Sequence, residues 1–224
     1  MLQGASARCF KPRRQNAYGG RMAAVPISQG QYLVSLARQS IEGYLANGKK
    51  SAPTHSEGAL SEMRGVFVTL EAHPSHELRG CIGYPLPIKE LALATVDCAL
   101  SAAFEDPRFP PVEKSELGKL VIEVSVLSVP EELKVKSPSE YLKKIKVGRD
   151  GLIIHYGYSS GLLLPQVPIE WNWDEEEFLC QVCEKAGLPR NMWQSPSAKI
   201  SSFSAQIFTE KTPGGEVSQK RLIR

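Results

Sequence analysis

The sequence lacks any apolar run long enough to cross a membrane. A membrane-spanning helix needs about 20 consecutive apolar residues, and the longest apolar segment, residues 91–104, is interrupted by Asp97. The N-terminal residues also lack the apolar region of a secretory leader. We therefore expect a cytoplasmic protein without a membrane-spanning segment.

Cysteine is scarce, with 5 in 224 residues. A sparse, odd-numbered set argues against a disulfide framework and is typical of a reducing compartment. Cys180 and Cys183 have the spacing of a metal-binding or redox pair, but a structural zinc site needs about four ligands. Both fall in a predicted helix with apolar neighbours, so we interpret them, like Cys98, as core residues.

The motifs of standard cofactor sites are missing as well. The sequence contains no P-loop, no Gly-x-Gly-x-x-Gly after a strand, no His-Glu-x-x-His and no serine nucleophile elbow, so we expect no cofactor. His73 and His76 lie with Glu71 and Glu77 in a polar stretch that is typical of a solvated turn, and we predict no metal site there. His155, in a predicted strand, is retained as a candidate base.

The chain carries little net charge, and that charge is unevenly placed. The formal net charge is +3, but residues 1–22 contain five basic residues and no acid, which leaves 22 basic and 24 acidic residues in the rest. The body therefore lacks the basic excess of a general nucleic-acid-binding protein. The composition of 1–22 predicts a disordered tail, with a nucleic-acid-binding arm or a transit peptide as alternatives.

Helices and strands are predicted in mixed order, without regular βαβ alternation. The clearest strand is 120–129, where Leu120, Ile122 and Val124 alternate with polar residues. This order predicts an α+β fold with mostly antiparallel sheets and flanking helices. The predicted helices cover about 28–46 (with Ser28 as a cap), 88–104, 137–142 and 175–186, and the predicted strands cover 66–70, 78–83, 120–129, 152–157, 161–167 and the end of 199–210; the polar residues from 211 are expected to be frayed.

The hexapeptide Leu78-Arg79-Gly80-Cys81-Ile82-Gly83 concentrates a cation, a thiol and two glycines in one predicted strand. Arg79 and Cys81 are two residues apart, so they point to the same face. A neighbouring arginine favours the thiolate, which is the reactive form of cysteine. The glycines allow another backbone or a ligand to approach closely.

Two interpretations of this strand follow from the residues alone. Cys81 is either a reactive thiol with Arg79 as its partner or anion clamp, or part of a structural, glycine-flanked strand. Asp106 and Arg108 are interpreted as a salt-bridged hinge that supports a neighbouring loop.

Four sequence blocks together resemble the AMMECR domain family. The hexapeptide is similar to the family's hallmark motif, and the order and spacing of the other blocks fit one domain over 23–212, between the tail 1–22 and a polar C-terminal tail 213–224. The other three blocks are Ala103-Phe104-Glu105-Asp106-Pro107-Arg108-Phe109-Pro110-Pro111, Leu163-Leu164-Pro165-Gln166-Val167, and Phe178-Leu179 with Cys183-x-Lys185-Ala186-Gly187-Leu188 and Trp193.

The resemblance implies a two-lobed fold, with a larger lobe from both chain ends and a smaller lobe from the middle. It also implies an interlobe cleft beside the hexapeptide, and it implies no defined reaction. Microbial members of the family lead us to expect Memo-like and radical-SAM-type proteins as partners. The residues expected at the cleft, besides Arg79 and Cys81, are Leu78, Gly80, Ile82, Gly83, Glu105, Asp106, Arg108 and Gln166.

Two functions fit these residues. In an enzyme or enzyme accessory, Cys81 acts as nucleophile or covalent carrier on a small or protein-borne substrate, Arg79 binds an anionic group, and Glu105, Asp106 or Gln166 orients the substrate. In a non-catalytic module, the same cleft binds a small anionic ligand or a partner peptide, and Cys81 only packs.

Overall fold

The computed structural model describes residues 24–220. The basic segment 1–22, with its predicted disorder or nucleic-acid-binding role, lies outside this range. The described chain divides into two compact units. The larger unit contains 24–128 and 206–220, and the smaller unit contains Val129–Ala205.

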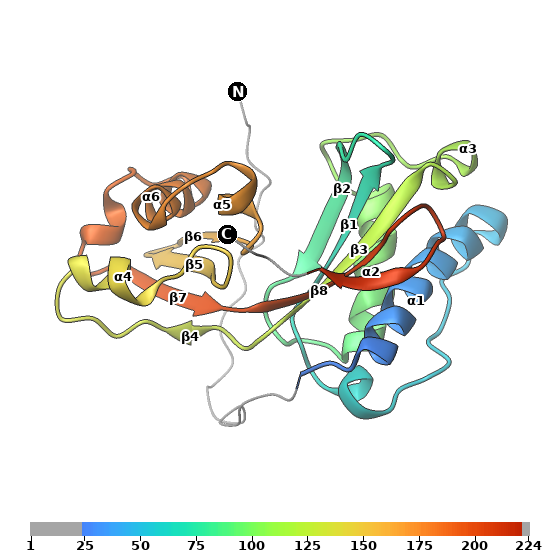
Figure 1. The fold of residues 1–224 in the computed structure, drawn as a ribbon, viewed down its shortest axis with the longest axis horizontal. Coiled ribbons are helices and arrows are strands. Elements are labelled where there is room, and N and C mark those ends of the chain that lie inside the picture. The colour runs from blue at the N-terminus through green and yellow to red at the C-terminus, as the bar shows by residue number, and fades with distance from the viewer. Residues whose placement is uncertain (1–23, 221–224) are drawn as a thin grey trace. The chain divides into compact units, whose positions relative to one another are not determined.

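The larger unit is built on a five-stranded sheet of order β2-β1-β3-β8-β9 (Figure 1). Strand β1 pairs antiparallel with both β2 and β3, and β8 pairs antiparallel with β9. The strands are β1 (Val66–Ala72), β2 (Leu78–Tyr84), β3 (Leu120–Leu127), β8 (Ala205–Glu210) and β9 (Val217–Lys220), and the helices are α1 (Ile27–Asn47), the 3₁₀ turn η1 (Gly58–Ser61), α2 (Leu91–Phe104) and α3 (Lys114–Leu117).

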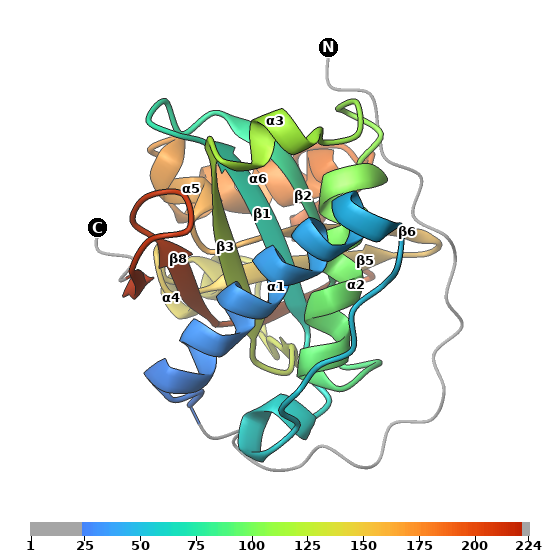
Figure 2. The same ribbon diagram turned by 90° about the vertical axis from the view of Figure 1, so that its right-hand side faces the viewer.

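One face of this sheet is covered by α1 and α2 (Figure 2). The inward side chains of β3 alternate, and Ile122 and Val124 are fully buried beneath the helices. The helices contribute Leu33, Ile41 and other apolar residues at three-to-four spacing. The opposite face of the sheet therefore carries the intervening residues, which include the polar side chains of the hexapeptide.

The smaller unit contains a second antiparallel sheet, of order β4-β7-β5-β6. Helix α6 packs on it through Phe178, Leu179 and Val182, which are fully buried. The two antiparallel sheets confirm the predicted α+β class. The elements of this unit are β4 (Glu131–Glu132), α4 (Ser139–Lys144), β5 (Gly151–Tyr156), β6 (Ser159–Leu163), α5 (Val167–Glu170), α6 (Glu175–Lys185), η2 (Met192–Gln194) and β7 (Lys199–Phe203).

Several element ends differ from the predictions for local reasons. Helix α1 is capped by Pro26, whose carbonyl accepts the N–H groups of residues 29 and 30, and not by Ser28. Helix α2 begins at Leu91, three residues later than predicted, because Leu91 N–H donates to the carbonyl of Glu62 and the preceding residue forms a bridge with Met63. The expectation of a frayed chain from 211 is wrong for 217–220, which pair with β8.

Within residues 24–220, none of the helices combines the length and hydropathy that a membrane crossing requires.

Candidate functional site

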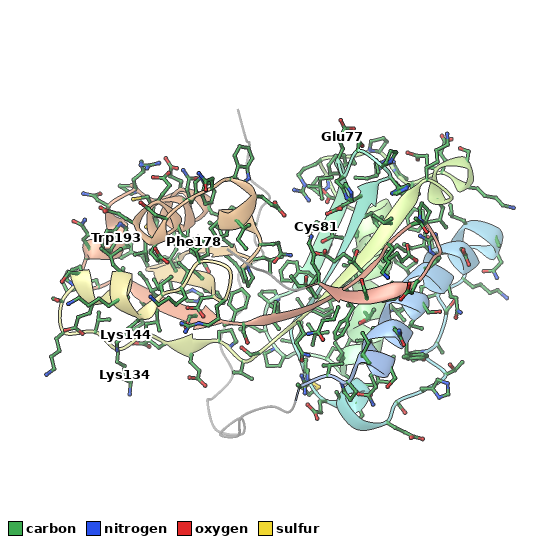
Figure 3. The ribbon with its side chains drawn as sticks, viewed as in Figure 1. Glu77, Cys81, Lys134, Lys144, Phe178 and Trp193 are labelled. Atoms are coloured by element: carbon green, nitrogen blue, oxygen red, sulfur yellow. The ribbon has the colours of Figure 1, made fainter. Side chains whose placement is uncertain are left out.

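The hexapeptide forms most of β2, the edge strand of the larger sheet. This confirms the strand predicted over 78–83. In the register of this hairpin, Cys81 lies opposite Thr69 and Gly83 lies opposite Phe67. Leu78 stands at the start of the strand and is 41% exposed, whereas Ile82 packs against the core of the unit. Figure 3 shows Cys81 on this strand.

The glycines of the motif are required by contacts within the chain. A Cβ at Gly80 would lie 2.2 Å from the carbonyl oxygen of Ala102 in α2, and a Cβ at Gly83 would lie 2.3 Å from the ring of Phe67. The close neighbours are thus the backbone of α2 and an aromatic ring. Of the two expected approaches, that of another backbone is therefore observed at Gly80, whereas the ring of Phe67 fills the space at Gly83.

The Cys81 thiol lies in polar surroundings on the face opposite the helices. The Thr69 hydroxyl donates to its sulfur at 3.3 Å. Burial raises the pKa of the Cys81 thiol, and this effect outweighs the lowering by the Thr69 hydrogen bond and by the positive charge of Arg108. The carboxylates of Glu123 and Asp106 raise the pKa further. A raised pKa favours the protonated thiol at neutral pH, which agrees with the structural one of the two interpretations of this strand.

Arg79 is not the cation that acts on Cys81. Its Nε and Nη2 each lie 3.1 Å from a carboxylate oxygen of Glu116 in α3, and Nη2 also donates to the carbonyl of Pro111. Its Nη1 is buried and has no hydrogen-bond acceptor among residues 24–220. Glu116 is itself held by the capping box of α3, in which its carboxylate accepts the N–H of Glu113.

The loop 105–111 covers the open edge of β2 at Cys81. Asp106 Oδ2 accepts the Cys81 N–H at 2.9 Å, and Arg108 Nη2 donates to the Cys81 carbonyl at 3.3 Å. The two side chains are joined by hydrogen bonds of 2.9 and 2.7 Å. They therefore satisfy backbone groups that an edge strand otherwise leaves available for another chain.

Asp106 and Arg108 each stabilise the charged form of the other. Burial acts to raise the pKa of Asp106, but hydrogen bonds from Arg108 and from the Cys81 N–H outweigh it and hold the pKa below its ordinary value. The Asp106 carboxylate in turn raises the pKa of Arg108. The predicted salt bridge is thus present, and it anchors the loop to the strand that carries Cys81.

Phe109 links the two arginines of the site. Its ring centroid lies 5.9 Å from the guanidinium carbon of Arg79 and 5.4 Å from that of Arg108, which are cation–π distances. We call Arg79, Phe109 and Arg108 the arginine–phenylalanine cluster. Loop 105–111 thus brings both guanidinium groups of the predicted site to one aromatic ring.

The comparison with protein families identifies the family of this chain. Residues 34–208 match AMMECR1. The chain belongs to the AMMECR1 family. Protein MJ0810 of Methanocaldococcus jannaschii is 52% identical over 202 residues, which cover 90% of this chain and 100% of the relative. Protein MK0488 of Methanopyrus kandleri is 52% identical over 197 residues, which cover 88% and 95%.

A solved structure supports the fold of this AMMECR1-family chain. The crystal structure of the uncharacterized protein PH0010 from Pyrococcus horikoshii matches with a TM-score of 0.84 and 51% sequence identity. The match covers 87% of this chain and 98% of that chain. The α+β architecture of the AMMECR1-family chain is therefore shared with a solved relative.

Three further residues from the sequence analysis are each described within their own unit of the AMMECR1-family chain. Glu105 is exposed at the end of α2 and accepts a hydrogen bond from Ser101 at 2.7 Å. Gln166 is buried in the smaller unit at the start of α5. His155 lies on β5 in that unit, where burial and then Lys199 lower its pKa. The predicted interlobe cleft stays a prediction.

The sequence also predicts that Cys98, Cys180 and Cys183 are core residues. Cys98 and Cys183 are buried in the cores of the two units, as expected, and Cys180 is half-buried on α6. Burial, the largest effect, raises the pKa of Cys98 to about 12 and that of Cys183 to about 11. These thiols therefore behave as small apolar side chains.

Three contributors to the site were missed from the sequence. Thr69 could have been found from the predicted hairpin, because its register places it opposite Cys81. Phe109 lies in the sequence block 103–111, but its neighbours in sequence do not indicate that its ring contacts two arginines. Glu116 is 37 residues from Arg79, and its Glu-x-x-Glu spacing with Glu113 indicates only a helix cap.

Proposed function

We propose that this AMMECR1-family domain is a ligand-binding module whose site is the arginine–phenylalanine cluster. The observation that carries the proposal is the parallel use of the two guanidinium groups. Arg79 binds Glu116, and Arg108 binds Asp106, through Nε and Nη2 in each case. Each arginine is therefore held in place while its Nη1 keeps N–H donors for another group.

Donation from the Nη1 of Arg79 to a ligand oxygen would relieve an energetic cost. A buried donor without an acceptor costs about 1–3 kcal/mol, and this atom is buried without one among the described residues. Arg108 presents its charge closer to solvent, since its side chain is 45% exposed. The Phe109 ring between them offers a flat apolar surface to the rest of a ligand.

The charge of the site favours a carboxylate ligand. Two arginines are balanced by Asp106 and Glu116, and nearby Glu123 pairs with Lys220 at 3.3 Å. A nearly neutral site is better matched to a singly charged planar carboxylate than to a phosphate dianion, and guanidinium groups bind carboxylates with matching geometry. We therefore assign a small carboxylate-bearing molecule or a peptide carboxylate as the ligand.

The proposal is tested by thermal stabilisation with acetate and benzoate, two singly charged carboxylates, as probes. A ligand that binds only the folded state raises the melting temperature in proportion to ln(1 + [L]/Kd). Arg79→Gln and Arg108→Gln should each abolish the shift, whereas Cys81→Ser should retain it. Arg190→Gln is the matched control, because Arg190 is a similarly exposed arginine paired with Glu177 and Glu184.

The reverse pattern contradicts this proposal. A shift that survives both arginine substitutions but disappears in Cys81→Ser would place the function on the thiol. If Arg190→Gln lost as much of the ligand-induced shift in melting temperature as Arg108→Gln, the shift would reflect the overall charge of the protein and not a specific site.

A second candidate is an enzyme or enzyme accessory that uses Cys81. The observation in its favour is that the sulfur accepts a hydrogen bond from Thr69 and lies near Arg108, instead of being sealed among apolar groups. Such chemistry requires a base to remove the thiol proton, because burial holds the thiol neutral. Memo-like and radical-SAM-type partners stay part of this prediction.

Alkylation with iodoacetamide separates the two candidates. The native protein at neutral pH should show Cys81 reacting more slowly than free cysteine, since the thiolate is the nucleophile and its fraction is reduced. A rate above that of free cysteine would support the enzyme. Cys98, which is buried with a pKa of about 12, is the internal control.

A further inference from the structure

The smaller unit contains a cavity of about 460 Å³ that none of the predicted site residues lines. Its walls come from the loop that follows β4, from α4, from η2 and from the start of β7. Small-molecule sites commonly have volumes of about 300–1,000 Å³. The cavity is therefore large enough for a small organic ligand.

The charged residues around this cavity are mostly lysines. Lys134, Lys136 and Lys199 line it, and Glu132 is the one acidic residue in the lining. Within residues 24–220, none of the three lysines forms an ion pair, in contrast to Arg149 of the same unit, which is paired with Asp150. Three ammonium groups against one carboxylate leave an excess of two positive charges.

The backbone under these lysines is held in place. Glu131 and Glu132 pair with β7, the Glu140 carboxylate accepts the N–H of Lys136, and Lys144 donates to the Lys134 carbonyl. Figure 3 shows Lys134 and Lys144 in this part of the smaller unit. The lysine side chains are thus carried by an ordered segment.

Two aromatic residues in the lining carry hydrogen-bond donors. Trp193 is 4% exposed, and its indole Nε1 is buried without an acceptor among the described residues. Such a donor costs about 1–3 kcal/mol unless an acceptor is supplied. Tyr141 is 7% exposed, and burial, followed by the Glu132 carboxylate, raises its pKa, so its hydroxyl remains a donor at neutral pH.

We propose that this cavity binds a small organic phosphate. The two excess positive charges match a phosphomonoester dianion, and lysine ammonium groups are common phosphate ligands. Trp193 and Tyr141 belong to the lining, so a ligand in the cavity lies against both aromatic side chains. Leu133, Val135 and Ala198 provide apolar wall for the organic part of the ligand.

The positions of other lysines distinguish a cavity ligand from a long polyanion. Lys143 and Lys146 lie in the same basic segment and are exposed, but they do not line the cavity. A nucleic acid would use all of these lysines, because phosphate contacts along a polyanion contribute in a largely sequence-independent way. Of these four lysines, only Lys134 and Lys136 line the cavity, so the affinity for a small phosphate should depend on those two.

The test is an NMR titration of the full-length, ¹⁵N-labelled protein. The chain has three tryptophans, and Trp193→Phe identifies the indole signal of Trp193 by its absence. Adenosine 5′-monophosphate, adenosine and inorganic phosphate are the probes. We expect the nucleotide to shift the Trp193 signal saturably, inorganic phosphate to bind more weakly, and adenosine to leave the signal unmoved.

Two charge-matched double variants complete the experiment. Lys134→Gln with Lys136→Gln should weaken nucleotide binding by about tenfold or more, because each removes a charge-assisted contact. Lys143→Gln with Lys146→Gln, which has the same net charge, should change the affinity by less than about twofold. Retained dispersion of the backbone spectrum verifies that each variant is folded.

Three outcomes overturn the proposal. They are an unmoved Trp193 signal at millimolar nucleotide, adenosine binding as tightly as the nucleotide, and equal weakening in the two double variants. The last result would assign the lysines to a polyanion. The arginine–phenylalanine cluster is unchanged in these variants, so they bear on this cavity and not on the carboxylate site.

Discussion

Replacing Gly80 by alanine tests the close contact between strand β2 and helix α2. The added Cβ would lie 2.2 Å from the carbonyl oxygen of Ala102 and 3.1 Å from its carbonyl carbon, and ordinary contact begins at 3.4 Å. Strand β2 and helix α2 must therefore separate by about 1 Å. The obstructing atoms are backbone, so no side-chain rotation relieves the contact.

The expected cost follows from these positions. Overpacking of a rigid core costs about 1–3 kcal/mol, and contact with a helix backbone favours the upper end. Alanine restricts the unfolded chain and returns about 0.4–1 kcal/mol. The free energy of unfolding should thus fall by about 2 kcal/mol, which corresponds to roughly 4–8 °C in melting temperature for a chain of this size.

Urea denaturation followed by circular dichroism measures this change. Gly118→Ala is the matched control, because nothing lies within 4 Å of its Cβ position and its φ of −68° suits alanine. The control should be unchanged or slightly more stable. If Gly80→Ala loses less than about 1 kcal/mol relative to Gly118→Ala, then β2 and α2 are less tightly packed than the contact distances indicate.

Further predictions concern two buried carboxylates. Asp106→Asn should lower the free energy of unfolding by about 1.5–3 kcal/mol at pH 7, because charged hydrogen bonds to Arg108 and to the Cys81 N–H are lost. The folded pKa of Asp106 is depressed, so this advantage of the wild type is complete above about pH 4 and disappears as the pH falls through the folded value; denaturation at pH 7 and pH 3 measures it, and an unchanged difference would contradict the assignment. Glu210→Gln should cost about 3 kcal/mol, because Glu210 is 5% exposed and accepts two hydrogen bonds from Arg38 and one from the N–H of Ile122; a change below about 1 kcal/mol in the same assay would show that the pair is dispensable.

Local pattern was sufficient for most of the elements in the chain. The alternation at 120–129 predicts β3, and the helix predicted over 175–186 is observed as α6, at whose start Asp174 accepts the N–H of Glu177. These features depend on side-chain periodicity and on contacts three residues apart. The start of α2 was misplaced because its position depends on Glu62 and Met63, which lie across the fold.

The electrostatics of the site could not be predicted from neighbouring residues. Arg79 and Cys81 share a face of β2, but Arg79 is bound by Glu116 and the positive charge near the sulfur is that of Arg108. Proximity in sequence gave the wrong sign for the pKa shift of Cys81, because burial outweighs a single nearby charge.

The sequence by itself determined the family, the α+β class and the strand with its two glycines, because each depends on short-range pattern or on the residue types present. Only the tertiary structure decided which carboxylate binds each arginine, and that the thiol is neutral. It also brought Trp193 together with the lysines after β4 around one cavity. These properties depend on distances between groups that are remote along the chain and on their removal from water, which local pattern does not encode.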